Sequence, residues 1–161
     1  MTIRRANPME TDYILQISGG LVQESSAGHL ENQGQNGYNL FLPMLQNGAY
    51  YLIDEDFGKL KGFILLGTHR HQMTGRTIGL LLHVYVFPGF RKSGIGRMLM
   101  QSAIHELHAR GIDTIQLNVY TGNPAKSLYE KLGFTSVSAV MELKKGIGMN
   151  PMPQRISGFN Y

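Results

Sequence analysis

The sequence predicts a single α/β domain in which strands alternate with amphipathic helices. Short runs rich in β-branched and aromatic residues are separated by segments whose apolar residues recur at helical spacing. The chain has 161 residues, of which 42% are hydrophobic and 16% charged, and this is the size and balance of one globular domain with a full core. The sequence contains neither an internal repeat nor a domain linker.

The first half of the chain is expected to form a strand, two helices and a strand pair. Apolar residues at helical spacing predict the first helix, and Gly19-Gly20 is its expected stop. The stretch after it is polar and glycine-rich, which indicates a loop. Two apolar runs on either side of the turn Asp54–Gly58 indicate a hairpin. In chain order the expected elements are strand Ile3–Ala6, helix 9–21, loop 22–37, helix Tyr38–Gln46, and strands Ala49–Ile53 and Leu60–Thr68.

The second half is expected to alternate strands and helices around one central strand. This strand is almost continuously apolar, as buried central strands are, and Pro88 ends it because proline has no N–H for a ladder. Gly111 is the expected stop of the next helix, and Asn123 with Pro124 is an expected start of the last one. In chain order the expected elements are strand Thr77–Phe87, helix Gly94–Ala109, strand Thr114–Tyr120, a helix that ends at Gly133, and strand Phe134–Leu143.

The turn between the central strand and the next helix has the pattern Arg-x-x-Gly-x-Gly at residues 91–96. A strand that enters a helix through such glycines suits a diphosphate, because the first helical turn has unpaired N–H groups and the positive end of the helix dipole. Arg91, Lys92 and Arg97 add positive charge. A basic helix start with ordinary turn glycines is the alternative interpretation.

Two other phosphate-binding motifs fit this segment poorly. A P-loop contains Gly-Lys-Ser or Gly-Lys-Thr, and neither occurs in this chain. A dinucleotide fingerprint needs a third glycine where this chain has Leu99, and it belongs to an early βαβ unit. The segment instead resembles the Arg/Gln-x-x-Gly-x-Gly/Ala loop of the GNAT-type N-acyltransferases.

The resemblance to the GNAT superfamily extends over residues 3–143 and rests on three segments in the family's order. These segments are Tyr85–Gly96, the hairpin Asp54–Phe63, and Gly122–Phe134, which is similar to Asn…Ala-x-x-Leu-Tyr-x-x-x-Gly-Phe. The resemblance implies a mixed central sheet of about six to seven strands, splayed between strands 4 and 5 and flanked by about four helices. It also implies a domain over residues 1–145, with 146–161 as a tail of the same domain or an oligomer contact.

The resemblance implies acetyl-CoA, or another acyl-CoA, as the donor. Its pantetheine arm would pair with the backbone of the fourth strand, because a strand edge offers donors and acceptors that match two amides. A backbone N–H there would also polarise the thioester carbonyl. The donor-binding residues implied in this way are Val84, Tyr85 and Val86 for pantetheine, and Arg91, Lys92, Ser93, Gly94, Ile95, Gly96 and Arg97 for the diphosphate.

Tyr129 and Asn123 are the residues that the resemblance implies in the second signature. Tyr129 matches a family tyrosine that protonates the leaving thiolate, and a phenol carries its proton at neutral pH. A packed tyrosine on an amphipathic helix is the alternative. Asn123 stands two residues before Ala125 where the family spacing is three, so a helix cap competes with its family role of bonding the pantetheine arm.

His83 is the expected general base. Acylation requires a free amine, and histidine has an unperturbed pKa of about 6.5. His83 stands eight residues before Arg91, where many family members carry a glutamate, and it interrupts an apolar run. By alternation it shares a strand face with Tyr85. A buried histidine bonded to a backbone carbonyl is the alternative.

Composition argues against several other classes of protein. Without cysteine there are no disulfides, thiolate nucleophiles or cysteine-type zinc sites, and a reducing cytoplasm is the expected compartment. The net charge is +4 with histidine neutral, but the basic residues are scattered, so no nucleic-acid partner is expected. The N-terminus lacks an apolar signal segment, and no membrane partner is expected. Two histidine pairs lack an obvious third ligand, so no metal site is expected at His69 and His71 or at His105 and His108.

We therefore expect an N-acetyltransferase that transfers an acetyl group directly from acetyl-CoA to a primary amine of a small molecule. A protein or peptide Nα- or lysine acetyltransferase is one alternative, and a non-catalytic acyl-CoA-binding sensor is another. Residues 19–48 are expected to select the acceptor, and Glu24, Glu31 and Asp54–Asp56 are candidates for attracting a cationic one. A homodimer contact through the tail is a further hypothesis.

Overall fold

The computed structural model describes residues 2–25 and 36–145 and confirms the predicted α/β fold. Within these residues, five strands form one mixed sheet in the order β1-β2-β3-β4-β5, where the resemblance implied six to seven. The first four strands are antiparallel neighbours, and β5 runs parallel to β4. In chain order the elements are β1 Thr2–Arg5, α1 Pro8–Ser25, α2 Asn36–Gln46, β2 Tyr50–Asp56, β3 Lys59–Arg70, β4 Thr77–Val86, the 3-10 helix η1 Pro88–Phe90, α3 Ile95–Ala109, β5 Ile115–Leu117 and α4 Lys126–Lys131.

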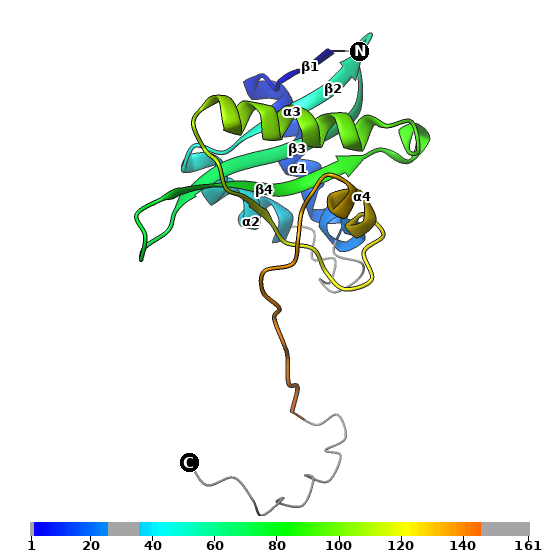
Figure 1. The fold of residues 1–161 in the computed structure, drawn as a ribbon. Helices are drawn as coiled ribbons and strands as arrows, with labels where there is room; N and C mark the ends of the chain where they lie inside the picture. Colours follow the sequence, from blue (N-terminus) through cyan, green and yellow to red (C-terminus); the bar gives the residue numbers. More distant parts are fainter. Residues whose placement is uncertain (1, 26–35, 146–161) are drawn as a thin grey trace, which may run out of the picture.

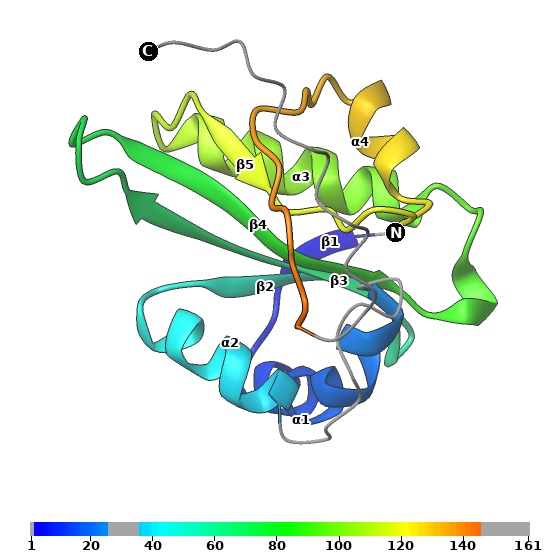
Figure 2. The ribbon, with the colours of Figure 1, turned by 90° about the horizontal axis from the view of Figure 1, so that it is seen from below.

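Helices cover both faces of the sheet (Figures 1 and 2). α1 and α2 lie on one face, while α3 and α4 lie on the other. Side-chain alternation along each strand divides the core accordingly: in β2, Leu52 packs in the cluster with α3 and its neighbour Ile53 packs in the cluster with α1 and α2. The sheet is therefore buried on both faces, and apolar burial in two layers stabilises it.

α1 begins one residue before its predicted start and continues through the glycine pair that was predicted to stop it. Asn7 and Glu10 form a reciprocal capping box at its start. Asn7 Oδ1 accepts the Glu10 N–H at 2.9 Å, and Glu10 Oε2 accepts the Asn7 N–H at 2.8 Å. A Cβ on Gly37 of α2 would overlap the backbone nitrogen of Gly19. Gly19 and Gly37 therefore allow α1 and α2 to approach closely. The prediction that Gly19-Gly20 ends the first helix was wrong.

β4 and β5 separate after a short paired stretch, as the predicted splay between strands 4 and 5 requires. β4 pairs with β3 over Thr77–Val86, but with β5 only over Gly79–Leu81. β5 ends at Leu117, three residues before its predicted end. On the β5 side, the backbone of β4 from Leu82 to Val86 therefore has no strand partner among residues 2–25 and 36–145.

The predicted last strand, Phe134–Leu143, is not formed. These residues lie in neither a helix nor a strand, and the chain after α4 runs away from the body of the protein (Figure 1). Val140 and Leu143 are 99% and 98% exposed. Alternating apolar residues predict a strand only where a partner backbone and a core face are available. In the described structure this segment has no partner backbone, and only Phe134 at its start packs against the core. The tail 146–161 lies outside the described residues.

Candidate functional site

β4 places its side chains alternately in the two core layers. Tyr85 belongs to the cluster beneath α1 and α2, whereas Val84 and Val86 pack against the cluster around α3. His83 contacts aromatic rings on the Tyr85 side, so the predicted shared face of His83 and Tyr85 is confirmed. Among the described residues, the end of β4 without a strand partner on the β5 side thus lies between two packed layers, where an extended chain with amides can pair with it.

The glycine loop joins η1 to the start of α3. Gly94 directly precedes the helix with φ of 84°, and Lys92 has φ of 59°, so both residues adopt the left-handed region. No side chain of residues 2–25 or 36–145 caps the helix start, and the first turn carries no acidic residue. α3 has 15 residues, so its first N–H groups can donate hydrogen bonds to an anion here. The positive end of its dipole also favours a bound anion.

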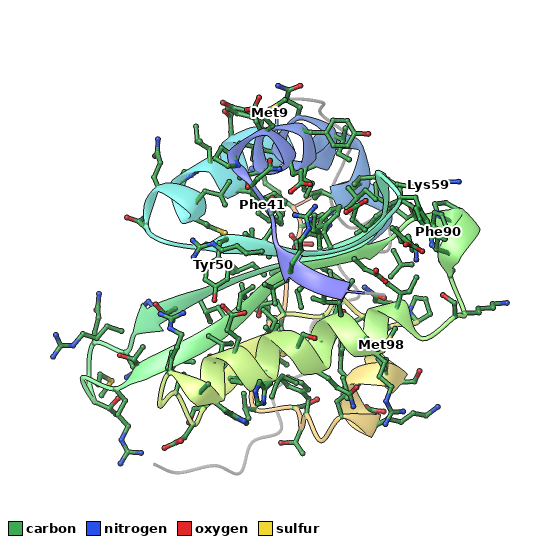
Figure 3. All side chains as sticks on the ribbon, turned by 90° about the horizontal axis from the view of Figure 1, so that it is seen from above. Met9, Phe41, Tyr50, Lys59, Phe90 and Met98 are labelled. Atoms are coloured by element: carbon green, nitrogen blue, oxygen red, sulfur yellow. The ribbon has the colours of Figure 1, made fainter. Side chains whose placement is uncertain are left out.

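The hairpin between β2 and β3 lies beside this loop. Lys59 Nζ is 5.1 Å from the centroid of the Phe90 ring, and Figure 3 shows the two side chains together at one end of the molecule. Ser93 Oγ donates a hydrogen bond to the carbonyl of Phe90, which holds the loop close to η1. The positive charges of Lys59 and Lys92 therefore both lie near the turn that leads into α3.

Arg91 connects the loop to β4 and to α1. Its Nε donates to the carbonyl oxygen of Val86 at 2.8 Å, and its Nη2 lies 2.6 Å from Glu24 Oε1. Tyr85 Oη donates to Glu24 Oε2 at 2.8 Å, and the guanidinium carbon is 5.4 Å from the centroid of the Tyr85 ring. Glu24 and Tyr85 are 61 residues apart in sequence, so no local pattern could have predicted this cluster.

His83 lies in an aromatic slot between α2 and the sheet. Its ring stacks on Phe41, with centroids 5.0 Å apart, and meets the edge of Phe63 at 5.3 Å. Figure 3 shows Phe41 on the sheet side of α2. The imidazole is 6% exposed, and this burial lowers the pKa of His83 to about 4. The ring is therefore neutral at pH 7, which is the protonation state that a general base requires.

Tyr129 lies on the other side of β4. It is 8% exposed in the α3 cluster, against which Val84 and Val86 pack, and its ring meets Phe134 with centroids 6.4 Å apart. Burial raises the pKa of Tyr129 above its ordinary value, so the phenol keeps its proton at neutral pH. The structure thus places Tyr129 and His83 in the layers on either side of the β4 edge.

Asn123 closes a turn ahead of the last helix. Its Oδ1 accepts the N–H of Ala125 at 2.9 Å, and its carbonyl oxygen accepts the N–H of Lys126 at 3.1 Å. α4 begins at Lys126, two residues later than predicted, and ends before Gly133. The asparagine oxygen therefore stabilises the turn that leads to the helix, as Asx turns do.

Two surface hollows, of about 380 and 530 Å³, lie beside β1 and away from the free edge of β4. Arg4 lines both, and its guanidinium is bonded to Glu10 at 2.7 Å and to Glu55 at 3.2 Å. None of the predicted donor-binding residues lines either hollow. In the described residues, no cluster of three His, Cys, Asp or Glu side chains could hold a metal ion, and no helix is long and apolar enough to span a bilayer.

The profile of the acetyltransferase (GNAT) family matches residues 21–134. The [ribosomal protein bS18]-alanine N-acetyltransferase of Haemophilus influenzae is 28% identical over 125 residues, which are 78% of this chain and 73% of that protein. Its Salmonella typhimurium counterpart is 42% identical over 59 residues, which are 36% of this chain and 40% of that enzyme. Mycothiol acetyltransferase of Saccharomonospora viridis is 29% identical over 102 residues, 61% of this chain and 33% of that protein.

Solved structures share the fold. A predicted acetyltransferase of Clostridium acetobutylicum, crystallised with acetyl-CoA, superimposes with a TM-score of 0.70 over 89% of this chain and 95% of that one, at 18% identity. The ribosomal-protein-alanine N-acetyltransferase of Brucella melitensis does so with a TM-score of 0.67 over 89% and 97%, also at 18% identity. At 18% sequence identity, these superpositions show that this chain and the two solved structures share a fold.

Proposed function

The chain belongs to the acetyltransferase (GNAT) family, and on that premise we propose that it transfers an acetyl group directly from acetyl-CoA to a primary amine of a small molecule. The observation that carries the donor part of the proposal is the end of β4, which has no strand partner on the β5 side among residues 2–25 and 36–145. It leads through η1 into the glycine loop and the start of α3. A donor with two amides and a diphosphate matches these two features in the order in which the chain presents them.

The proposed donor site uses backbone groups more than side chains. Backbone groups of Val84–Val86 that face the β5 side, other than the Val86 carbonyl bonded to Arg91, would pair with the pantetheine amides, while the N–H groups of 92–97 would bind the diphosphate. Gly94 supports the second role, since its φ of 84° is a conformation that a side chain would strain. Arg91, Lys92 and Arg97 would supply charge at the same turn.

In the proposed site the base and the acid lie in the two layers on either side of the β4 edge. In the proposed reaction the amine nitrogen attacks the carbonyl carbon, and His83 accepts the proton that the nitrogen loses. The carbon–sulfur bond breaks, and Tyr129 gives its proton to the leaving thiolate. A backbone N–H of Val84–Val86 would stabilise the carbonyl oxygen as negative charge develops on it. The neutral imidazole and the protonated phenol support these assignments.

A peptide N-terminus is a second candidate acceptor. The Haemophilus and Salmonella relatives are named [ribosomal protein bS18]-alanine N-acetyltransferases, and this name favours a protein α-amine. The α1–α2 layer of this chain borders the His83 side of β4 and would select between the two kinds of acceptor. A non-catalytic acyl-CoA sensor would share the donor site without a reactive acceptor.

The test of this proposal is release of free CoA thiol from acetyl-CoA in the presence of defined amines. One panel contains aliphatic polyamines and amino sugars, and the other contains peptides with either a free α-amine or a free lysine ε-amine. Mass spectrometry of the product identifies the acetylated nitrogen. Amine-dependent thiol release with a small amine supports the first proposal. Acetylation of peptides alone replaces it with the second, and donor binding without turnover on either panel supports the sensor.

We also propose that the protein forms a homodimer in the cytoplasm. The support for the dimer is the exposed segment after α4, in which Val137, Val140, Met141 and Leu143 are 79 to 99% exposed. An extended segment with so much exposed apolar surface is typical of an interaction site. Light scattering coupled to size-exclusion chromatography checks this: Val140→Lys should convert a dimer to a monomer, and a monomeric wild type would contradict the proposal.

A further inference from the structure

The ion pair between Arg91 and Glu24 brings the C-terminal end of α1 to the basic loop that precedes α3. Arg91 Nη2 and Glu24 Oε1 are 2.6 Å apart, and the two side chains are 40% and 49% exposed. The other carboxylate oxygen of Glu24 accepts the Tyr85 hydroxyl at 2.8 Å. The carboxylate thus lies beside the turn for which the proposed function needs an anion.

We propose that Glu24 is an internal competitor of the donor's diphosphate for Arg91, and that donor binding displaces it. The inference rests on the proposed function, since it assumes that the diphosphate binds at residues 91–97. In the ligand-free chain Glu24 neutralises Arg91. When the diphosphate binds, Arg91 exchanges one anion for another, and the Glu24 carboxylate becomes available to a cationic acceptor.

The hydrogen bonds of Arg91 suit this exchange. Its Nε is fixed by the carbonyl oxygen of Val86 at 2.8 Å, so the guanidinium stays at the end of β4 whichever anion it binds. A guanidinium presents its remaining N–H donors in a planar fork, and this fork matches a phosphate as well as it matches a carboxylate. The backbone contact therefore positions the side chain, while the pair with Glu24 can be replaced.

Electrostatics favours displacement once the donor is bound. The charged side chains at the turn, Arg91, Lys92 and Arg97, are all basic, and the first turn of α3 has no acidic residue. A diphosphate there repels the nearby Glu24 carboxylate. Both partners of the ion pair are substantially exposed to water, and exposed pairs of this kind are worth little. The pair is therefore strong enough to weaken donor binding by a few-fold and too weak to prevent it.

A double-mutant cycle with CoA tests the inference without an acceptor. Isothermal titration calorimetry measures the Kd of CoA for the wild type, Glu24→Gln, Arg91→Met and the double variant. We expect Glu24→Gln to lower the Kd about two- to fivefold, the range that an exposed ion pair supports. In the Arg91→Met background the same substitution should bring a smaller gain, because it then removes only the repulsion between Glu24 and the diphosphate and releases no guanidinium. Thermal unfolding confirms that each variant is folded.

Glu130→Gln is the matched control. It removes one negative charge from α4, where Glu130 pairs with Lys126 at 3.8 Å, and it should leave the Kd of CoA unchanged. An unchanged or higher Kd in Glu24→Gln would overturn the inference and indicate that Glu24 only tethers α1 to β4. A gain of equal size without Arg91 would also overturn it, since repulsion alone would then explain the effect. Failure of the wild type to bind CoA would instead contradict the proposed function.

Discussion

The imidazole of His83 stacks on the ring of Phe41, with 5.0 Å between the ring centroids and 7° between the ring planes. Phe63 meets the same imidazole edge-on, and the ring is 6% exposed. These contacts keep the imidazole neutral, and they also make its protonation unfavourable inside the fold. The packing of His83 therefore links the proposed base to the pH dependence of stability.

Stability should fall on acidification because of His83. Its pKa of about 4 in the fold lies below the value of about 6.5 in an unfolded chain, so the unfolded state binds more protons between these two values. Above about pH 7.5 both states are almost fully neutral, and His83 contributes little pH dependence. Between pH 7.5 and 5 we expect His83 to remove about 2 kcal/mol from the free energy of unfolding.

Urea denaturation at pH 7.5 and at pH 5 measures this loss. His83→Phe keeps an aromatic ring in the slot and cannot be protonated, so its pH dependence should be weaker than that of the wild type by about the same 2 kcal/mol. His105→Gln changes an exposed histidine on α3 and should behave as the wild type does. Equal pH dependence in the wild type and His83→Phe would contradict a buried neutral imidazole.

Loss of the base should lower turnover more than donor binding. His83→Gln removes the proton acceptor, and we expect kcat to fall about a hundredfold, with the Kd of CoA changed less than about twofold. In the wild type, His83 is deprotonated above pH 5, so it should add no acidic limb to kcat between pH 5 and 8. His105→Gln again serves as the control. Unchanged turnover in His83→Gln would exclude His83 as the base.

Loss of the proposed acid, Tyr129, should also slow acetyl transfer. Tyr129 lies on the side of β4 opposite His83. Tyr129→Phe keeps the ring in the α3 cluster and removes only the hydroxyl, so we expect kcat to fall about ten- to a hundredfold with the fold intact. Burial raises the pKa of Tyr129, so the phenol should remain an acid throughout pH 6 to 9. Tyr13→Phe on α1 is the matched control, since Tyr13 is 54% exposed. Equal kcat values for Tyr129→Phe and the wild type would assign Tyr129 to packing alone.

Two glycine substitutions should have opposite effects on stability. A Cβ on Gly62 would lie 2.8 Å from the carbonyl oxygen of Tyr85 and 3.2 Å from a methyl carbon of Leu99, so Gly62→Ala should destabilise the fold by about 1–3 kcal/mol. A Cβ on Gly20, inside α1, would meet no atom within 4 Å, so Gly20→Ala should stabilise it by about 0.5–1 kcal/mol. Urea denaturation of both variants measures the two effects. Stabilisation by Gly62→Ala would contradict the close contact between β3 and β4.

The order of elements could be predicted because most elements carry a local signal. The apolar run of β4, Pro88 after it and the stripe of α3 identify a strand, a turn and a helix without knowledge of the rest. The capping box at Asn7 and Glu10 was also legible and would have placed the start of α1 correctly. The predictions that were wrong concerned features that depend on contacts between distant segments.

Three features that the sequence could not predict show this dependence on distant contacts. Gly19 continues a helix because Gly37 packs against it, and nothing in the local sequence distinguishes this from a helix stop. The segment 134–143 has the alternation of a strand but finds no partner backbone among the described residues. The pairing of Glu24 with Tyr85 and Arg91 joins α1 to β4 and to the glycine loop, and only the folded chain brings these side chains together.

A crystal structure of the protein with CoA tests the central claim most directly. The account predicts that the pantetheine amides hydrogen-bond to the backbone of Val84–Val86 and that the diphosphate accepts N–H groups of residues 92–97. It also predicts that the sulfur lies between the layers that contain His83 and Tyr129. CoA bound elsewhere, for example in the hollows beside β1, would contradict the assignment of the free β4 edge and the glycine loop as the donor site.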